Sequence, residues 1–259
     1  MAKPKHAAKK PNRIKYVFIA IAVIAVIVGI VVIIGVTHPP IDDPVTAYVP
    51  ETTMEAPTTT TTEPPTTAIT ETGVTVNSDG SIVFEPGDSY TNKYCVAVNR
   101  QANVVTVYEK DENGNYAKPV KAFPCSCGRE GHETPAGTFT TSDRYPWLHM
   151  VDNSEGQYTT RIKGAIWFHS VCYFTKDKSN LEYEEYNKLG SPASLGCVRL
   201  CCADAKWLYD NLDFATIVTI YDSPLPGPLG KPESIKIDTN DERRGWDPTD
   251  PDPANPWNK

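Results

Sequence analysis

Two residues of this chain have the type and the setting for nucleophilic catalysis. Cys197 lies in the segment SLGCVRL (194–200), a turn of small residues that we expect to open towards a helix. A thiol near a helix N-terminus and a basic neighbour is expected to have a lowered pKa. His169 ends the apolar stretch IWFHS (166–170). Because a histidine base is the usual activator of a thiol, the sequence predicts that Cys197 is a nucleophile and His169 its base.

Gly196, next to this cysteine, lets the backbone approach a substrate closely, and we expect its N–H to be free to face an oxyanion. The spacing alone leaves two alternatives open. One is that the cysteine and the histidine are ordinary core residues. The other is a zinc site, because thiolates and imidazoles are common zinc ligands. Its members would be His169, Cys172, Cys197 and Cys201.

The elements that must position these residues are mostly short strands. Alternating or β-branched apolar residues predict strands at 94–98, 104–108, 120–125, 138–141, 165–169 and 217–221. Two amphipathic stretches predict short helices at 181–189 and 203–212. The sequence therefore predicts a mostly-β domain of two packed sheets with a few short helices, over residues 90–222.

An apolar segment precedes this domain. Residues 16–36 carry no charge, and a helix of this length spans roughly the 30 Å hydrocarbon core of a bilayer. Six basic residues lie in 1–15 and the next follows only at Lys93, which predicts a transmembrane helix with a cytoplasmic N-terminal tail. A cleaved signal peptide is the alternative, although its apolar region is usually shorter.

Composition predicts a linker before the domain and a tail after it. Residues 37–89 contain nine acidic residues and no Lys or Arg, and 37–72 contain thirteen Thr and seven Pro, which predicts a disordered extracellular linker. Residues 223–259 form a Pro/Asp-rich tail, either disordered or held on the domain as a strap. The net charge is −7 and the basic residues cluster only in 1–15, which argues against a nucleic-acid partner.

Seven cysteines leave at least one thiol unpaired within an exported chain. Cys172 is a candidate partner for one member of the adjacent pair Cys201 and Cys202. Cys125 and Cys127 are a second candidate pair, with Cα atoms about 6.6 Å apart if the segment is a strand. The alternative is that all the additional thiols are reduced and buried.

The joint pattern of these motifs resembles a known family. SLGCVRL, the strand-end His169-Ser170 pair and the segment TPAGTF (134–139) resemble the L,D-transpeptidase catalytic domain (YkuD-like), over about Tyr94 to Tyr221. The resemblance implies that fold, with no metal or organic cofactor. It also implies that Cys197 attacks the carbonyl between the third and fourth residues of a peptidoglycan stem peptide and forms a thioester, while His169 takes the thiol proton.

The resemblance further implies supporting roles for neighbouring residues. The Ser170 carbonyl would orient the imidazole, and the N–H groups around Gly196 and Cys197 would form the oxyanion hole. Arg199 would brace the motif or meet a substrate carboxylate. Tyr158 and Arg161 would line the substrate cleft, with surface packing as the alternative. The family's most familiar motif has His where this chain has Leu195, which cannot donate a side-chain hydrogen bond.

Together these features predict an L,D-transpeptidase of the cell membrane. Residues 16–36 would anchor it in the lipid bilayer, with the catalytic domain outside the cell. That domain would form 3→3 cross-links between donor and acceptor stem peptides during cell wall biogenesis. An L,D-carboxypeptidase and a non-catalytic wall-binding module are the alternatives. An apolar flap over the cleft would favour transfer over hydrolysis, or the same residues would simply pack their helix down. Its members would be Tyr173, Phe174, Leu181, Tyr183 and Tyr186.

Overall fold

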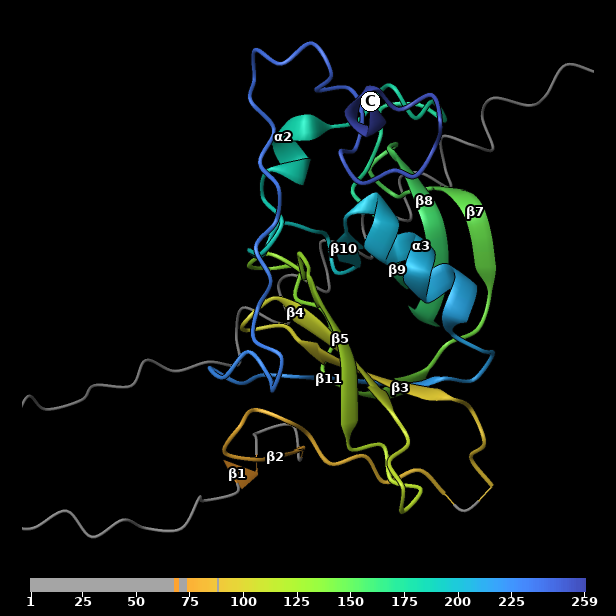
Figure 1. Ribbon diagram of the computed structural model, residues 1–259, viewed down its shortest axis with the longest axis vertical. Coiled ribbons are helices and arrows are strands. Elements are labelled where there is room, and N and C mark those ends of the chain that lie inside the picture. Colours follow the sequence, from red (N-terminus) through yellow and green to blue (C-terminus); the bar gives the residue numbers. More distant parts are fainter. Residues whose placement is uncertain (1–67, 70–73, 88) are drawn as a thin grey trace, which may run out of the picture. The chain divides into compact units, whose positions relative to one another are not determined.

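The structure, a computed structural model, describes residues 68–69, 74–87 and 89–259 (Figure 1). The predicted N-terminal tail and transmembrane helix, and most of the predicted linker, lie outside these residues. Within the described part, none of the helices has the length and apolar character needed to cross a bilayer.

One of the two main sheets has five strands in the order β5-β4-β3-β11-β6. Strands β3, β4 and β5 form an antiparallel meander, and β11 joins it parallel to β3 and antiparallel to β6. Their bounds are Tyr94–Asn99 (β3), Val104–Glu109 (β4), Lys118–Pro124 (β5), Gly137–Thr140 (β6) and Ile217–Tyr221 (β11). All five overlap strands that the sequence predicts.

The other main sheet has four strands in the order β10-β9-β8-β7; His169 lies in β9, and Cys197 immediately precedes β10. Its parallel pair β9–β10 sets Arg199 directly opposite His169. Arg199, two residues after the predicted nucleophile, is thereby fixed next to the predicted base. The bounds are Arg144–His149 (β7), Glu155–Lys163 (β8), Ile166–Ser170 (β9) and Val198–Leu200 (β10).

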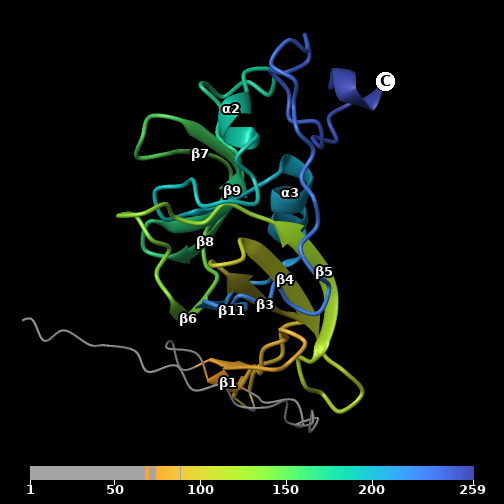
Figure 2. The same cartoon turned by 90° about the vertical axis from the view of Figure 1, so that its left-hand side faces the viewer.

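The main core lies between the two sheets, which Figure 2 shows one above the other. Val96 and Val98 of β3 meet Phe168 of β9 and Leu200 of β10 there. Each of these side chains is fully buried. Burying a large apolar side chain contributes about 1.5–3 kcal/mol, so this layer fixes the strand that carries His169 and the strand that follows Cys197.

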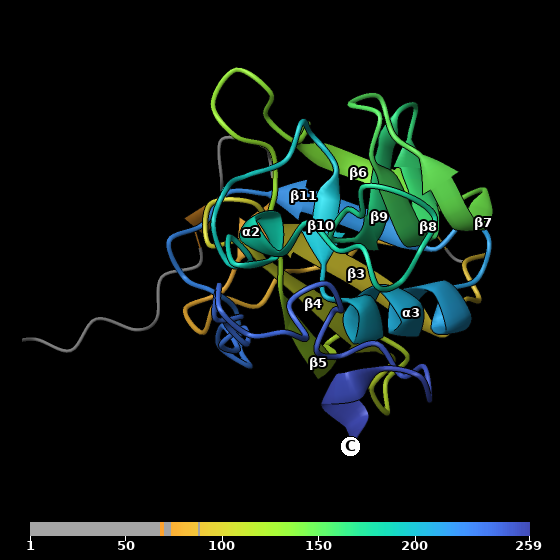
Figure 3. The ribbon, with the colours of Figure 1, turned by 90° about the horizontal axis from the view of Figure 1, so that it is seen from above.

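Two helices complete the domain. Helix α3 (Cys202–Asn211) packs on β8 and β9 through Ala205 and Leu208, close to the predicted bounds (Figure 3). Helix α2 (Tyr183–Tyr186) is shorter than the predicted 181–189, because the chain turns at Leu189 and Gly190 with a positive φ of 93° at the glycine. A 3-10 turn η1 (Pro256–Asn258) lies near the C-terminus.

The folded region begins earlier than the predicted boundary at residue 90. Strand β1 (Ala68–Ile69) pairs with β2 (Thr75–Val76). Val74, Val76 and Ile82 are buried and pack in one cluster with Cys95 and Tyr108, on the face of the five-stranded sheet opposite the main core. The C-terminal part of the predicted linker, residues 74–87, therefore belongs to the fold.

Residues 223–259, which we call the C-terminal strap, also pack on the domain. The strap runs beside α2 and α3 in two views (Figures 1 and 2). Its Ile237 is buried with Leu181 and Leu189, and the side chains of Asp247, Asp250 and Asn255 are fully buried. Of the two alternatives for this tail, the structure shows the strap.

The predicted mostly-β fold of two sheets with few helices is confirmed. Strands β7, β8 and β10 are absent from the prediction. Their segments are rich in polar residues and include Pro146, so they lack a plain apolar alternation. Two of these missed strands, β7 and β10, contribute residues to the wall of the cavity described next.

Candidate active site

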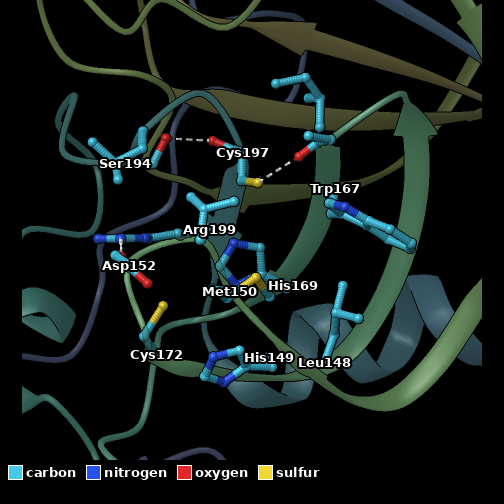
Figure 4. Close-up of a pocket in the computed structure, with 14 residues that line it drawn as sticks. Leu148, His149, Met150, Asp152, Trp167, His169, Cys172, Ser194, Cys197 and Arg199 are labelled. Carbon is cyan, nitrogen blue, oxygen red and sulfur yellow. Dashed lines mark hydrogen bonds and ion pairs between the residues drawn. The ribbon is translucent and has the colours of Figure 1, made fainter. Parts of the chain in front are cut away.

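Cys197 lies in the tight turn that leads into β10, and it lines a cavity (Figure 4). Its thiol donates to the Ala165 carbonyl over 3.5 Å, and the Trp167 N–H faces the sulfur. Gly196 makes the turn possible, because its φ of 117° lies in a region that favours glycine. A Cβ there would also lie 3.0 Å from Ile166 Cδ1.

The electrostatic setting of Cys197 differs from the predicted one. The residue precedes a strand, and the helix begins only at Cys202, so no helix N-terminus faces the thiol. Burial raises the pKa of Cys197, against smaller opposing effects of the Trp167 N–H and the Arg199 charge. The predicted lowered pKa is therefore wrong, and the thiol needs a base when it attacks.

His169 has the properties of such a base. Its side chain is buried in β9, and its Nδ1 lies 2.6 Å from the Ser170 carbonyl oxygen. Because a carbonyl only accepts, Nδ1 carries the proton and Nε2 keeps its lone pair. Burial, reinforced by the charge of Arg199, lowers the pKa of His169 to about 3, so the ring is neutral at physiological pH.

Strand β8 holds the histidine in this orientation. The Gln157 N–H donates to Ser170 Oγ over 2.9 Å, and Ser170 Oγ donates to the Val171 carbonyl over 2.7 Å. Gly156 faces the imidazole, and a Cβ there would lie 3.0 Å from His169 Nδ1 and clash with Met150 Cε. Ser170 therefore has the predicted position, whereas the contribution of Gly156 was not predicted.

Hydrogen bonds within the nucleophile turn change the predicted oxyanion hole. Ser194 Oγ donates to the Cys197 carbonyl over 2.6 Å and accepts from the Gly196 N–H over 3.1 Å. The Gly196 N–H is thus not free, contrary to expectation. Thr134 donates to the Gly196 carbonyl over 2.9 Å, so the TPAGTF segment supports the turn directly.

Arg199 is buried and braces three segments. Its guanidinium donates to Glu185 of α2 over 2.8 Å and lies 3.5 Å from Asp152, in the turn between β7 and β8. Its Nε has no hydrogen-bond partner among the described residues. Of the two roles suggested by the resemblance, these contacts favour bracing the motif.

The structure does not bring Tyr158 and Arg161 to the cavity wall. The Tyr158 ring packs edge-on against Tyr209 of α3. Arg161 pairs with Asp143 over 2.8 Å, and its guanidinium lies 4.1 Å from the ring centroid of Trp167. Tyr158 thus has the packing position that the sequence left open, and Arg161 stacks on the tryptophan.

The aromatic residues proposed as a flap also lie elsewhere. Tyr186 is fully buried in one cluster with Leu181 and Ile237 of the strap, and Tyr183 packs at the edge of that cluster. Tyr173 and Leu181 are buried in the same cluster, Phe174 is exposed, and none of the five lines the cavity. The alternative, in which these rings pack the helix against the domain, fits their positions.

The cavity itself encloses about 600 Å3 with its open mouth. Cys197 and His169 share it with Asp152, and most of the remaining wall is apolar. The other lining residues include Leu148, Met150, Val151, Ile166, Trp167 and Leu195. Sequence reasoning missed the contribution of 148–152, which belongs to the unpredicted hairpin of β7 and β8.

The seven cysteines are all free thiols in the structure. Cys125 Sγ and Cys127 Sγ approach to 3.8 Å, and both residues are buried. Across the described part of the chain, no three His, Cys, Asp or Glu side chains are gathered in a way that could hold a metal ion. The four residues of the zinc alternative therefore form no such group.

Known proteins are similar in sequence to this region of the chain. The family model described as the L,D-transpeptidase catalytic domain matches residues 93–220. The protein named "Putative L,D-transpeptidase YciB" from Bacillus subtilis (strain 168) is 42% identical over 91 residues, which is 34% of this chain and 46% of that protein. The chain thus spans about half the length of this curated relative.

Solved structures are more distant. A structure titled as LD transpeptidase LdtMt1 in complex with imipenem has a TM-score of 0.41 and 17% identity, covering 50% of this chain and 59% of that chain. An L,D-transpeptidase from Mycobacterium tuberculosis H37Rv has a TM-score of 0.40 and 20% identity, covering 50% and 58%. The family-model match covers the sheet strands that carry His169 and flank Cys197. Residues 93–220 of the chain are therefore similar to the L,D-transpeptidase catalytic domain.

Proposed function

We propose that this protein is an L,D-transpeptidase that joins two peptidoglycan stem peptides by a 3→3 cross-link through a thioester at Cys197. One observation carries the proposal: a thiol and a neutral imidazole line the same cavity, and the imidazole keeps Nε2 free because Nδ1 bonds to Ser170. A neutral base next to a protonated thiol is the arrangement that nucleophilic catalysis requires.

In the first step, Cys197 Sγ attacks the carbonyl between the third and fourth stem residues while His169 Nε2 takes the thiol proton. The carbonyl oxygen becomes an oxyanion, and the Cys197 N–H is the candidate donor to it, since the Gly196 N–H donates to Ser194. Collapse breaks the C–N bond. The departing amine of D-Ala takes the proton from His169, and a thioester remains.

In the second step, the amine of another stem attacks the thioester. His169 takes a proton from the attacking nitrogen and returns it to the departing sulfur, which restores the enzyme. Water in place of the amine would make the protein an L,D-carboxypeptidase. The apolar cavity wall, with Trp167 and Met150, supports transfer because it limits access of water to the thioester.

The location of this reaction follows from the N-terminal sequence. We propose that residues 16–36 anchor the protein in the cell membrane, that 1–15 face the cytoplasm, and that the catalytic domain faces the cell wall. The charge-free apolar run and the six basic residues before it support this orientation.

The proposal is tested with the full-length protein in detergent and a disaccharide tetrapeptide as substrate. Intact-mass measurement should reveal an acyl adduct, and product analysis should reveal 3→3 dimers with some tripeptide. Cys197→Ala should abolish both, whereas Cys95→Ala, which alters a buried thiol outside the cavity, should retain them. Tripeptide without dimer at high acceptor concentration would favour the carboxypeptidase, and stem-peptide binding without any adduct would favour the wall-binding module.

A further inference from the structure

We infer that Asp152 is a specificity-determining residue, whose carboxylate binds the ammonium form of the acceptor amine at the cavity. This inference rests on the proposed function and names the group that selects the acceptor. Asp152 lies in the turn between β7 and β8, and it lines the same cavity as Cys197 and His169 (Figure 4).

Asp152 is held in a fixed orientation. Ser154 donates to Asp152 Oδ1 twice, from its hydroxyl over 2.6 Å and from its N–H over 3.2 Å. The Asp152 side chain is still 32% exposed, whereas that of Arg199 is only 7% exposed. The carboxylate is therefore both oriented by the protein and accessible from the cavity.

The ion pairs around Arg199 leave negative charge at Asp152. Arg199 forms its shorter ion pair with Glu185, at 2.8 Å, and lies 3.5 Å from Asp152. Partial burial opposes ionisation of Asp152. The hydrogen bonds from Ser154 and the charge of Arg199 outweigh it and hold the pKa of Asp152 below its usual range. The single positive charge of Arg199 is thus shared between two carboxylates, so the negative charge of Asp152, which lines the cavity, is only partly neutralised.

Apart from Arg199, whose buried guanidinium also lines the cavity and pairs with Glu185 and Asp152, the rest of the cavity offers few charged groups to a ligand. His169 is neutral, the Cys197 thiol is protonated, and Trp167, Met150 and Leu195 present apolar surface. His149 also lines the cavity, but its Nδ1 is engaged with Glu155 at 2.9 Å. A carboxylate in apolar surroundings attracts a cation more strongly than one in water does.

The acceptor of a transpeptidase supplies this cation. An alkyl amine with an ordinary pKa near 10.4 arrives protonated at neutral pH. We place its N⁺–H groups on Asp152, in a charge-assisted hydrogen bond. The ammonium releases one proton to solvent. The resulting amine then forms the C–N bond to the thioester carbon, His169 Nε2 takes its second proton, the C–S bond breaks, and the sulfur recovers the proton from His169.

The test compares acceptors of different charge in the full-length protein. With a tetrapeptide donor and an amine acceptor, Asp152→Asn should raise the acceptor KM about ten-fold, since a charge-assisted hydrogen bond is lost. The single-turnover rate of Cys197 acylation should change little. Hydroxylamine, which is largely uncharged at neutral pH, should react with the acyl-enzyme of both proteins at the same rate.

Two further variants separate charge from packing. Asp152→Glu keeps the carboxylate and should restore most of the acceptor KM. Glu184→Gln removes an exposed carboxylate of α2 that does not line the cavity, and it should leave the KM unchanged. Melting temperatures check that each variant is folded, and the KM for the charged acceptor in the unmodified protein should rise with ionic strength.

Three results would overturn the inference. An unchanged acceptor KM in Asp152→Asn, with normal acylation, would overturn it while leaving the proposed function intact. An equal loss with the amine and with hydroxylamine would show that Asp152 only positions Arg199. Absence of any acyl-enzyme in the unmodified protein would overturn the proposed function, and this inference with it.

Discussion

Two polar clusters in the described part of the chain differ in how completely the protein itself pairs their polar groups. One lies in the C-terminal strap and the other at the cavity. In the strap, Asp247 is fully buried and paired on both oxygens. Oδ2 accepts from the Cys202 N–H over 2.7 Å, and Oδ1 accepts from the N–H and hydroxyl of Thr249. Asn255 donates to the carbonyls of Asp247 and Asp250. The strap cluster is therefore closed within the protein.

The cavity cluster is left open. His169 has a free Nε2, Arg199 has an unpaired Nε, and the Asp152 carboxylate is partly exposed. A buried polar group without a partner is costly, and at the cavity a bound substrate would supply the missing partner. The comparison indicates that the strap stabilises the domain, whereas the cavity keeps its polar groups for substrate.

The strap also supplies the N-terminal cap that helix α3 lacks in its own sequence. The N-cap residue of α3, Cys201, makes no side-chain capping bond. Asp247, which is 45 residues away from Cys202, provides the carboxylate that accepts from the first turn, and Thr249 Oγ accepts from the Ala203 N–H. A negative charge there also complements the positive end of the helix dipole.

The largest expected effect is on catalysis. His169→Ala should lower kcat by about 10²–10⁴-fold, because general-base catalysis contributes that much. Asn255→Ala, the matched change in the strap cluster, should lower stability and leave kcat of the folded protein nearly unchanged. Product formation and chemical unfolding of each variant provide the measurements. A kcat of His169→Ala within a few-fold of the unmodified protein would show that the cavity cluster is not the catalytic one.

A smaller loss of activity is expected from Gly156→Ala. Its Cβ would press on His169 Nδ1 and Met150 Cε, and a displacement of a catalytic group by about 1 Å can cost about 10²-fold in rate. Gly87→Ala is the control, since a Cβ there meets nothing within 4 Å. Single-turnover acylation measures the effect. Equal acylation rates for the two variants would contradict the role of Gly156.

Asp247→Ala should destabilise the domain by about 1–3 kcal/mol, because the Cys202 N–H and the Thr249 groups lose a buried acceptor. Urea unfolding measures this change, and Asp238→Ala, at an exposed strap position, should cost far less. Activity per folded molecule should stay close to that of the unmodified protein. Equal stability of the two variants would refute the capping role of the strap.

The smallest effect is a difference in pH dependence. Burial raises the pKa of Asp247 to about 6 and lowers that of His169 to about 3. As the pH falls from about 6 to 4, Asp247 gains a proton earlier in the folded protein and adds stability. Over the same interval, His169 gains one earlier in the unfolded chain and removes stability.

Unfolding free energies measured at pH 4.5 and 7 therefore distinguish the contribution of Asp247 in the strap from that of His169 at the cavity. Relative to the unmodified protein, Asp247→Asn should lose more stability on acidification and His169→Ala should lose less. Parallel pH profiles for all three proteins would show that neither group titrates as its burial implies.

The positions of the main strands followed from local pattern. In β3, Tyr94, Val96 and Val98 pack into the core on one face of the sheet, and Cys95 and Ala97 pack into the core on the other face. Because side chains alternate between faces with a period of two residues, this strand could be predicted from the sequence. The candidate nucleophile and base could also be named from the sequence, because SLGCVRL and the strand-end histidine are short, continuous motifs, and the structure brings both side chains to one cavity. The thiol pKa was not, because the element after Cys197 is a strand.

Other features depend on contacts between distant segments. Asp152, Glu185 and Arg199 meet only because the β7–β8 turn, α2 and β10 converge on one guanidinium, and no local sequence period links them. The composition of the strap resembles that of a disordered segment, yet Asp247 is buried against a helix 45 residues earlier.

The sequence by itself determined the mostly-β fold, the candidate catalytic pair and the resemblance to L,D-transpeptidases, since these depend on residue type and near-neighbour spacing. Only the tertiary structure decided which polar groups are closed by partners and which face the cavity. Burial and long-range pairing set both the charge state of His169 and the accessibility of Asp152, and neither quantity exists until the sheets and the strap have packed.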